Sequence, residues 1–196
     1  MRALLLVGLL AAGCATTPPA RTAPSAPALP QFTTTTTPAP ERTERTVPRA
    51  CAQVITDVDL DELLETRLGS GTAEVAGQPM PAIGRTARLD CYFGVPGGKR
   101  EKAALVVTLA AYTDDAAAQE RLDRTVADER AQGARVSEVA VGPDTGYLIE
   151  GSTRIVVARH GKVTVVVQAA QALVPGESAR RVLPRVADRA LTHPSG

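Results

Sequence analysis

Few side chains in this 196-residue sequence have the types and spacing needed for catalysis. It has two histidines, His160 and His193, and three cysteines, Cys14, Cys51 and Cys91. His160 precedes a glycine in a pattern typical of a hairpin turn, where we expect a solvated ring, and His193 lies in the C-terminal tail. A Ser-His-Asp or Cys-His arrangement needs a well-placed histidine as its base. The sequence therefore predicts no catalytic residue.

Three aspartates at alternate positions, Asp57, Asp59 and Asp61, invite comparison with a calcium-binding loop. Such a loop needs glycine at its sixth position and glutamate at its twelfth, where this chain has Glu62 and Leu68. An acidic helix start, favoured by the helix dipole, explains the aspartates better. The glycine-rich loop that cradles phosphate is also missing from the sequence. We therefore expect no metal site and no cofactor.

Cys14 has the most informative surroundings of the three cysteines. Arg2 and an apolar run from Ala3 to Ala12 precede it, and a long Thr/Pro/Ala tract follows. A charged start, a short apolar core and a small-residue cleavage site are typical of a secretory signal. The run has half the length of the roughly 20 residues that a spanning helix needs. With cysteine next to Gly13, the segment resembles a bacterial lipoprotein signal, which implies cleavage after residue 13 and a lipid on Cys14.

The alternative for this segment is an ordinary signal of a soluble secreted protein. That reading predicts a small residue where Cys14 stands. The usual lipoprotein pattern has leucine three residues before the cysteine, whereas this chain has Ala11 there and Leu10 one step earlier. We expect the lipidated form, held on the extracytoplasmic face of the cell membrane by its acyl chains.

The chain divides at about residue 48. Residues 14–48 comprise the cysteine and a tract that contains eight prolines and ten threonines, which we expect to form a disordered tether. Residues 49–196 are long enough for one domain with a real core. Removing the four arginines and two glutamates of residues 1–48 leaves 18 basic and 19 acidic side chains, so nothing in the charge indicates a nucleic-acid partner.

Two cysteines remain for the domain once Cys14 is assigned to the lipid. Outside the cytoplasm, Cys51 and Cys91 can form a disulfide, which we expect to join the segment before the first helix to a strand. Two buried free thiols are the alternative. A zinc site is disfavoured because neither histidine stands near a cysteine in the sequence.

Apolar periodicity predicts three helices in an otherwise β-rich domain. The first has Asp59 as its cap and an apolar stripe that reaches Leu68, and it ends at Gly69. The central helix begins after Asp114 or Asp115 and ends at Gly133, and its expected inward face is Ala118, Leu122 and Val126, extended by Ala127. The last runs from about Glu177 to Leu191, with Pro184 expected to kink it or to begin its better-formed half.

Alternation and turn residues predict the strands and the hairpin between the last two of them. The turn is expected at His160-Gly161, and Tyr112 and Tyr147 are expected either to line a pocket or to pack in the core. An antiparallel sheet packed against N-terminal, central and C-terminal helices, with one disulfide, gives an α+β fold. The expected strands are Arg88–Val95, Ala103–Tyr112, Val136–Val141, Tyr147–Glu150, Arg154–Arg159 and Val163–Ala169.

Taken together, these features resemble an actinobacterial cell-envelope lipoprotein family of unknown function. The shared motifs are Cys51 before an acidic helix, the segment Asp90-Cys91-Tyr92-Phe93, and the run Val141-Gly142-Pro143-Asp144 before a hairpin and a last helix. The extracellular sensor domains of some actinobacterial Ser/Thr kinases are similar too. The resemblance implies no catalytic residues. The family often has tryptophan after the second cysteine, where this chain has Tyr92.

The sequence thus predicts a membrane-anchored, non-enzymatic lipoprotein. Its partners would be the membrane, through the lipid, and an unidentified envelope ligand or protein. The alternatives are an envelope hydrolase with an unconventional site and a structural subunit of an envelope complex.

Overall fold

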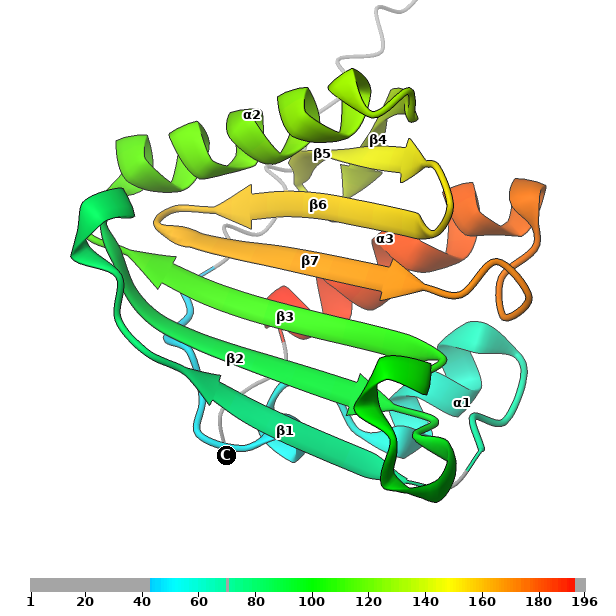
Figure 1. The fold of residues 1–196 in the computed structure, drawn as a ribbon. Coiled ribbons are helices and arrows are strands. Elements are labelled where there is room, and N and C mark those ends of the chain that lie inside the picture. The colour runs from blue at the N-terminus through cyan, green and yellow to red at the C-terminus, as the bar shows by residue number, and fades with distance from the viewer. Residues whose placement is uncertain (1–42, 70, 193–196) are drawn as a thin grey trace, which may run out of the picture. The chain divides into compact units, whose positions relative to one another are not determined.

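The computed structural model describes residues 43–69 and 71–192 of the chain. The predicted signal peptide, Cys14, residues 15–42 of the predicted tether and His193 lie outside the described residues. The described part forms a seven-stranded antiparallel sheet with three α-helices, which confirms the predicted α+β class (Figure 1). None of its helices is both long and apolar enough to span a bilayer.

The sheet is built from two antiparallel meanders, and the spatial order of its strands is β1-β2-β3-β7-β6-β5-β4. The strands β3 and β7 pair where the two meanders meet, and α2 connects β3 to β4. Because side chains alternate across a strand, each strand contributes to both faces of the sheet. The bounds are β1 Thr72–Gly77, β2 Arg85–Phe93, β3 Leu105–Tyr112, β4 Arg135–Val141, β5 Asp144–Glu150, β6 Arg154–His160 and β7 Val163–Ala169.

The helices cover opposite faces of this sheet. On one face lie α1, Asp57–Leu64, and α3, Gly176–Thr192, which contact each other. On the other lies α2, Asp115–Ala131, which runs along the β4–β6 half (Figure 1). Four short 3-10 turns complete the described elements: η1 Cys51–Gln53, η2 Pro81–Ile83, η3 Pro96–Gly98 and η4 Arg100–Lys102.

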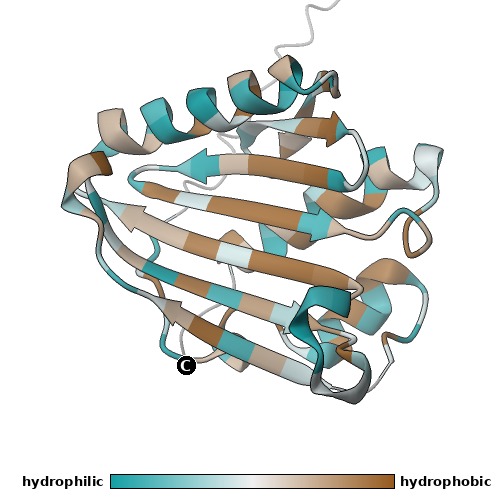
Figure 2. Cartoon of the chain, viewed as in Figure 1, coloured by the Kyte–Doolittle hydropathy of each residue, from teal (hydrophilic) through white to brown (hydrophobic). Residues whose placement is uncertain are grey.

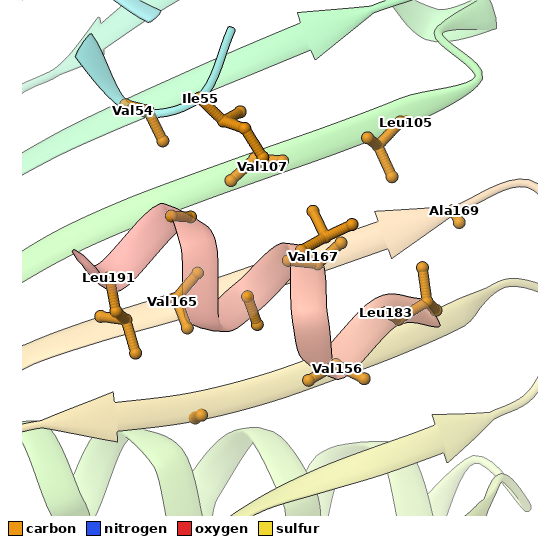
Figure 3. Packing of buried hydrophobic residues seen from close by; sticks show 14 of the residues in the cluster. Val54, Ile55, Leu105, Val107, Val156, Val165, Val167, Ala169, Leu183 and Leu191 are labelled. Carbon is orange, nitrogen blue, oxygen red and sulfur yellow. The ribbon is translucent and has the colours of Figure 1, made fainter. Parts of the chain in front are cut away.

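The main core lies between the sheet and α3. Figure 3 shows Leu183 and Leu191 of this helix facing Val156, Val165 and Val167 of the sheet. The predicted inward stripe of the helix is confirmed, because all of its members are buried. The helix runs through Pro184 without a break. The members of the stripe are Val182, Leu183, Val186, Ala187 and Leu191.

A disulfide joins Cys51 to Cys91, whose Cα atoms lie 5.5 Å apart. This confirms the predicted bridge and rejects the free-thiol alternative. Cys51 lies in η1, just before α1, and Cys91 lies on the α3 side of β2, so both sulfurs are buried in the main core. The bond connects the N-terminal segment to the sheet.

The first helix differs from its prediction at both ends. Thr56, not Asp59, is the N-cap, and Asp59 is the partner that completes a capping box with it. The helix stops at Leu64 because Glu65 takes a left-handed conformation, with φ of 54°. Leu68 still packs against the core, which explains why the apolar stripe extends beyond the helix.

Several smaller predictions also need correction. The β6–β7 turn is Gly161-Lys162, since His160 is the last residue of β6. Ala127 is exposed on α2, whereas the predicted Ala118, Leu122 and Val126 are buried. The folded part also begins before residue 49, because the Arg45 side chain is buried against α3.

Candidate functional site

An open cleft of about 690 Å³ lies on the face of the sheet opposite to α3. One wall is α2, which contributes Arg121, Leu122, Thr125 and Glu129. The other wall comes from η4 and from Tyr92 at the adjacent end of β2. The cleft exists because α2 covers only part of this face (Figure 1). The start of α2 packs on the end of β3, where Ala118 meets Ala110 and Tyr112, and the cleft lies above β2 and the rest of β3 and β7.

The strand register arranges the floor of the cleft in rows. The middle row runs from Asp90 on β2 through Thr108 on β3 and Val166 on β7 to Val157 on β6. The floor therefore changes from polar at β2 to apolar beneath α2. Figure 2 shows the same trend, with hydrophobic residues dominating β3, β7 and β6 and hydrophilic residues interspersed in β2.

The polar side of this floor is organised around Asp90, which is only 7% exposed. Arg88 Nε donates to both carboxylate oxygens of Asp90, at 3.0 and 2.9 Å, and Arg88 Nη2 lies 2.9 Å from Oδ1. The hydroxyl of Thr108 donates to Asp90 Oδ1 at 2.5 Å. A buried carboxylate needs such partners because isolated charges are costly in a core. The carboxylate of Asp90 is therefore held in place by hydrogen bonds, and the guanidinium of Arg88 compensates its charge.

The local sequence explains how Arg88 reaches this position. Residues two apart on a strand share a face, so Arg88, Asp90 and Tyr92 all point into the cleft. Gly77 of β1 pairs with Arg88. A side chain at this position would crowd Arg88, because its Cβ would lie only 2.9 Å from Arg88 Cβ. The hydrogen bond to Asp90 raises the pKa of Arg88 against the opposing effect of burial, and nearby Tyr92 and Tyr112 raise it further. Arg88 thus stays charged.

The two ends of the cleft differ in charge. At the η4 end, Arg100 and Lys102 are accompanied by Glu101 and, from α2, by Glu129. The guanidinium carbon of Arg100 lies 5.9 Å from the ring centre of Tyr92, within the range of a cation–π contact. This end is balanced between acids and bases.

At the opposite end, where β2 begins, the cleft is bordered by Arg85, Tyr112 and Arg121. Arg121 also lines a smaller cavity with Gly84, which places it beside the start of β2. Arg85 Nη2 donates to the carbonyl of Gln78 at 3.2 Å, while its buried Nε has no acceptor among the described residues. Neither Arg85 nor Arg121 forms an ion pair with a carboxylate of the described residues.

Tyr112 and Tyr147, which were expected either to line a pocket or to pack in the core, lie in different surroundings. Tyr112 lines the cleft and is also 3% exposed, so both of its predicted roles apply. Tyr147 packs against the small cluster of Leu122, Val126 and Ile149 under α2. Tyr92, which was assigned no role from sequence, forms part of the cleft wall.

The prediction that His160 is solvated is wrong. Its side chain is 23% exposed, and Nδ1 lies 3.1 Å from Oδ1 of Asp144. The contact arises because His160 ends β6 and Asp144 begins β5, which places both at one edge of adjacent strands. Neither residue lines the cleft.

The three alternating aspartates of α1 do not form a joint site. Asp59 accepts hydrogen bonds from Thr56 and from Arg189 of α3, whereas Asp61 accepts one from the backbone of Leu68. Within residues 43–69 and 71–192, no group of three or more histidine, cysteine or acidic side chains is placed to hold a metal ion.

The cleft itself was not anticipated from sequence, although one signal for it was present. Arg88, Asp90 and Tyr92 alternate with Leu89, Cys91 and Phe93 along β2. Such alternation indicates a strand with one face away from the core. The partners that complete the floor come from β3, β6 and β7, and local sequence does not reveal their register.

No family model matches the chain, and no curated protein matches it. Among solved structures, the fold is similar to the crystal structure of the extracellular domain of PknH from Mycobacterium tuberculosis. The two are 12% identical with a TM-score of 0.48, and the match covers 76% of this chain and 98% of that chain.

Proposed function

We propose that this chain is a lipid-anchored extracytoplasmic protein that binds a ligand in the cleft above β2, β3 and β7 without transforming it. The lipoprotein-like signal, the Thr/Pro-rich tract and the Cys51–Cys91 disulfide support a location outside the cytoplasm. The cleft supports binding, because its volume of about 690 Å³ is typical of small-molecule sites.

The observation that carries this proposal is the ion pair in the cleft floor. A sheet face that is half exposed to solvent needs only uncharged polar side chains for stability. Here the charged side chain of Asp90 is buried instead, and Arg88 and Thr108 donate hydrogen bonds to it. A fully satisfied buried polar group adds rigidity and defined geometry. Such a floor suits recognition of a ligand, and its compensated carboxylate is poorly suited to act as a general base.

The test is to map where small molecules bind on the full chain. The variant Cys14→Ser, which removes the predicted acylation site, would allow NMR without detergent. A library of fragments of mixed charge is expected to shift the backbone amides of β2, β3, β7 and α2. Val166→Trp, which fills the cleft, should remove these shifts, and Val58→Trp on an exposed position of α1 should leave them unchanged. Shifts that cluster on another surface, or that survive Val166→Trp, would contradict the proposal.

A further inference from the structure

The charge distribution of the cleft points to the class of ligand. Among the described residues, five basic and three acidic side chains border it. Asp90 is already compensated by Arg88, and Glu101 and Glu129 lie at the η4 end with Arg100 and Lys102. No carboxylate of the cleft lining stands at the end formed by Arg85 and Arg121, although Glu120 and Asp128 line the adjoining smaller cavity together with Arg121 and Arg124. Planar guanidinium groups are suited to binding carboxylate and phosphate oxygens.

The apolar part of the floor is narrow and leads away from this cationic end. Val106 of β3 and Val166 of β7 are diagonal neighbours, since Val106 pairs with Gln168 and Thr108 pairs with Val166. Both valines are half-buried and line the cleft. Between β3 and β7 the stripe is flanked by Thr108 and Gln168, so it is about one side chain wide there. Beyond Val166 it meets Leu122, Ile155 and the buried Val157 beneath α2. A single alkyl chain fits such a stripe better than a ring system does.

We infer that the cleft binds a single-chain anionic amphiphile, with its anionic group at Arg85 and Arg121 and its alkyl chain along Val166 and Val106. This assignment rests on the proposed function and adds the chemical class and the orientation of the ligand. Charge complementarity sets the orientation. The exposed apolar stripe supplies the hydrophobic contribution, which grows with each methylene group that leaves water.

Tyrosine fluorescence offers a direct measurement of binding. The chain has three tyrosines and no tryptophan, and two of the three, Tyr92 and Tyr112, line the cleft. The probe is octyl phosphate, added below its micelle-forming concentration to the full chain with Cys14→Ser. We expect it to bind at least about tenfold more tightly than octyl glucoside, octyltrimethylammonium or inorganic phosphate, because a charge-assisted contact and the buried chain each contribute.

Matched arginine variants then test the orientation. Arg121→Gln should weaken octyl phosphate binding by about tenfold, the effect of losing one charge-assisted contact. Arg130→Gln, on the same helix but outside the cleft lining, should leave binding unchanged. Arg100→Gln should cost no more than about twofold, because this guanidinium lies over Tyr92 at the balanced end. Arg100, Arg121 and Arg130 are all exposed, so none of these changes endangers the fold.

The possible results separate the ligand class from the existence of the site. Equal binding of octyl phosphate and octyl glucoside, or equal losses in Arg121→Gln and Arg130→Gln, would overturn the anionic assignment. Inorganic phosphate binding as tightly as octyl phosphate would overturn the alkyl assignment, and a larger loss in Arg100→Gln than in Arg121→Gln would overturn the orientation. Fragments that still bound the cleft in the NMR experiment would leave the proposed function standing in each case.

Discussion

At the scale of single residues, Asp90 is the charge on which the cleft floor depends. Its carboxylate accepts hydrogen bonds from Arg88 and Thr108. The side-chain amide of Asp90→Asn cannot replace this carboxylate, because the amide nitrogen is a donor where an acceptor is needed. We expect this substitution to lower the free energy of unfolding by about 2 kcal/mol, the usual scale of a hydrogen bond to a charged group. Urea denaturation measures it, with Glu62→Gln, an exposed change on α1, as the control. A loss no larger than that of the control would mean that the ion pair contributes little.

The disulfide gives a second prediction at this scale. Cys51 and Cys91 are 40 residues apart in sequence, so the bond restricts a long loop of the unfolded chain. Cys51→Ser should lower the free energy of unfolding by about 2–5 kcal/mol, and the double serine variant should lose about the same amount, because both remove one bond. Denaturation under non-reducing conditions compares the variants. Mass spectrometry that found two free thiols in the wild-type protein isolated without reductant would contradict the bridge.

At the scale of elements, Asp59 links the start of α1 to the end of α3. Its Oδ2 accepts from the backbone and hydroxyl of Thr56 at 3.1 and 2.7 Å, and its Oδ1 accepts from Nη2 of Arg189 at 2.6 Å. Burial pushes the pKa of Asp59 upward, but the hydrogen bonds from Thr56 and Arg189 outweigh it, and the pKa lies below its ordinary value. The charged form is therefore the one that stabilises this contact.

The pH dependence follows from this lowered pKa. A carboxyl group whose pKa is lower in the folded state contributes its full stability above the unfolded pKa of about 3.9, and loses it as the pH falls through the folded value. Asp59→Asn should therefore cost about 1 kcal/mol at pH 7, the scale of a helix cap, and less as the pH drops below about 4. Denaturation across this range tests it, with the exposed Asp57→Asn as the control. A cost that did not depend on pH would contradict the role of the charge.

At the scale of the whole molecule, Arg45 ties the segment before α1 to the last helix. Its guanidinium donates to the carbonyls of Ala190 and Gln53, and the residue is 8% exposed. Burial lowers the pKa of this guanidinium. Arg45→Met keeps most of the volume but leaves both carbonyls without this donor, so we expect a loss of about 2 kcal/mol. Thermal denaturation compares it with Arg49→Met, which changes an exposed arginine; similar melting temperatures would contradict the role of Arg45.

The membrane anchor gives the remaining prediction at this scale. If Cys14 receives the lipid, Cys14→Ala should move the protein from the membrane fraction to the soluble fraction or leave it unprocessed, because stable anchoring depends on the acyl chains. Cell fractionation followed by immunoblotting measures the distribution. The double variant of Cys51 and Cys91 is the control, since those cysteines form the disulfide. Wild-type processing and membrane retention in Cys14→Ala would show that something else holds the protein there.

Much of the fold could be predicted from local patterns. The stripe of α3 follows from apolar spacing at helical periodicity, and β7 follows from its run of valines after a turn. The Cys51–Cys91 pairing was predicted by counting the two cysteines that remain once Cys14 is expected to carry a lipid. These features are encoded within a few residues or by residue type alone, so no knowledge of distant contacts is needed.

The cleft and the helix ends depended on contacts between distant segments. Asp59 meets Arg189 from 130 positions away, and the cleft rows combine β2 with β7, whose residues Asp90 and Val166 share one row. Which half of the sheet α2 covers is decided by packing of its Leu122 and Val126 on β5 and β6. Short-range periodicity shows that a strand has a polar face, but only the packed register shows which side chains assemble on it.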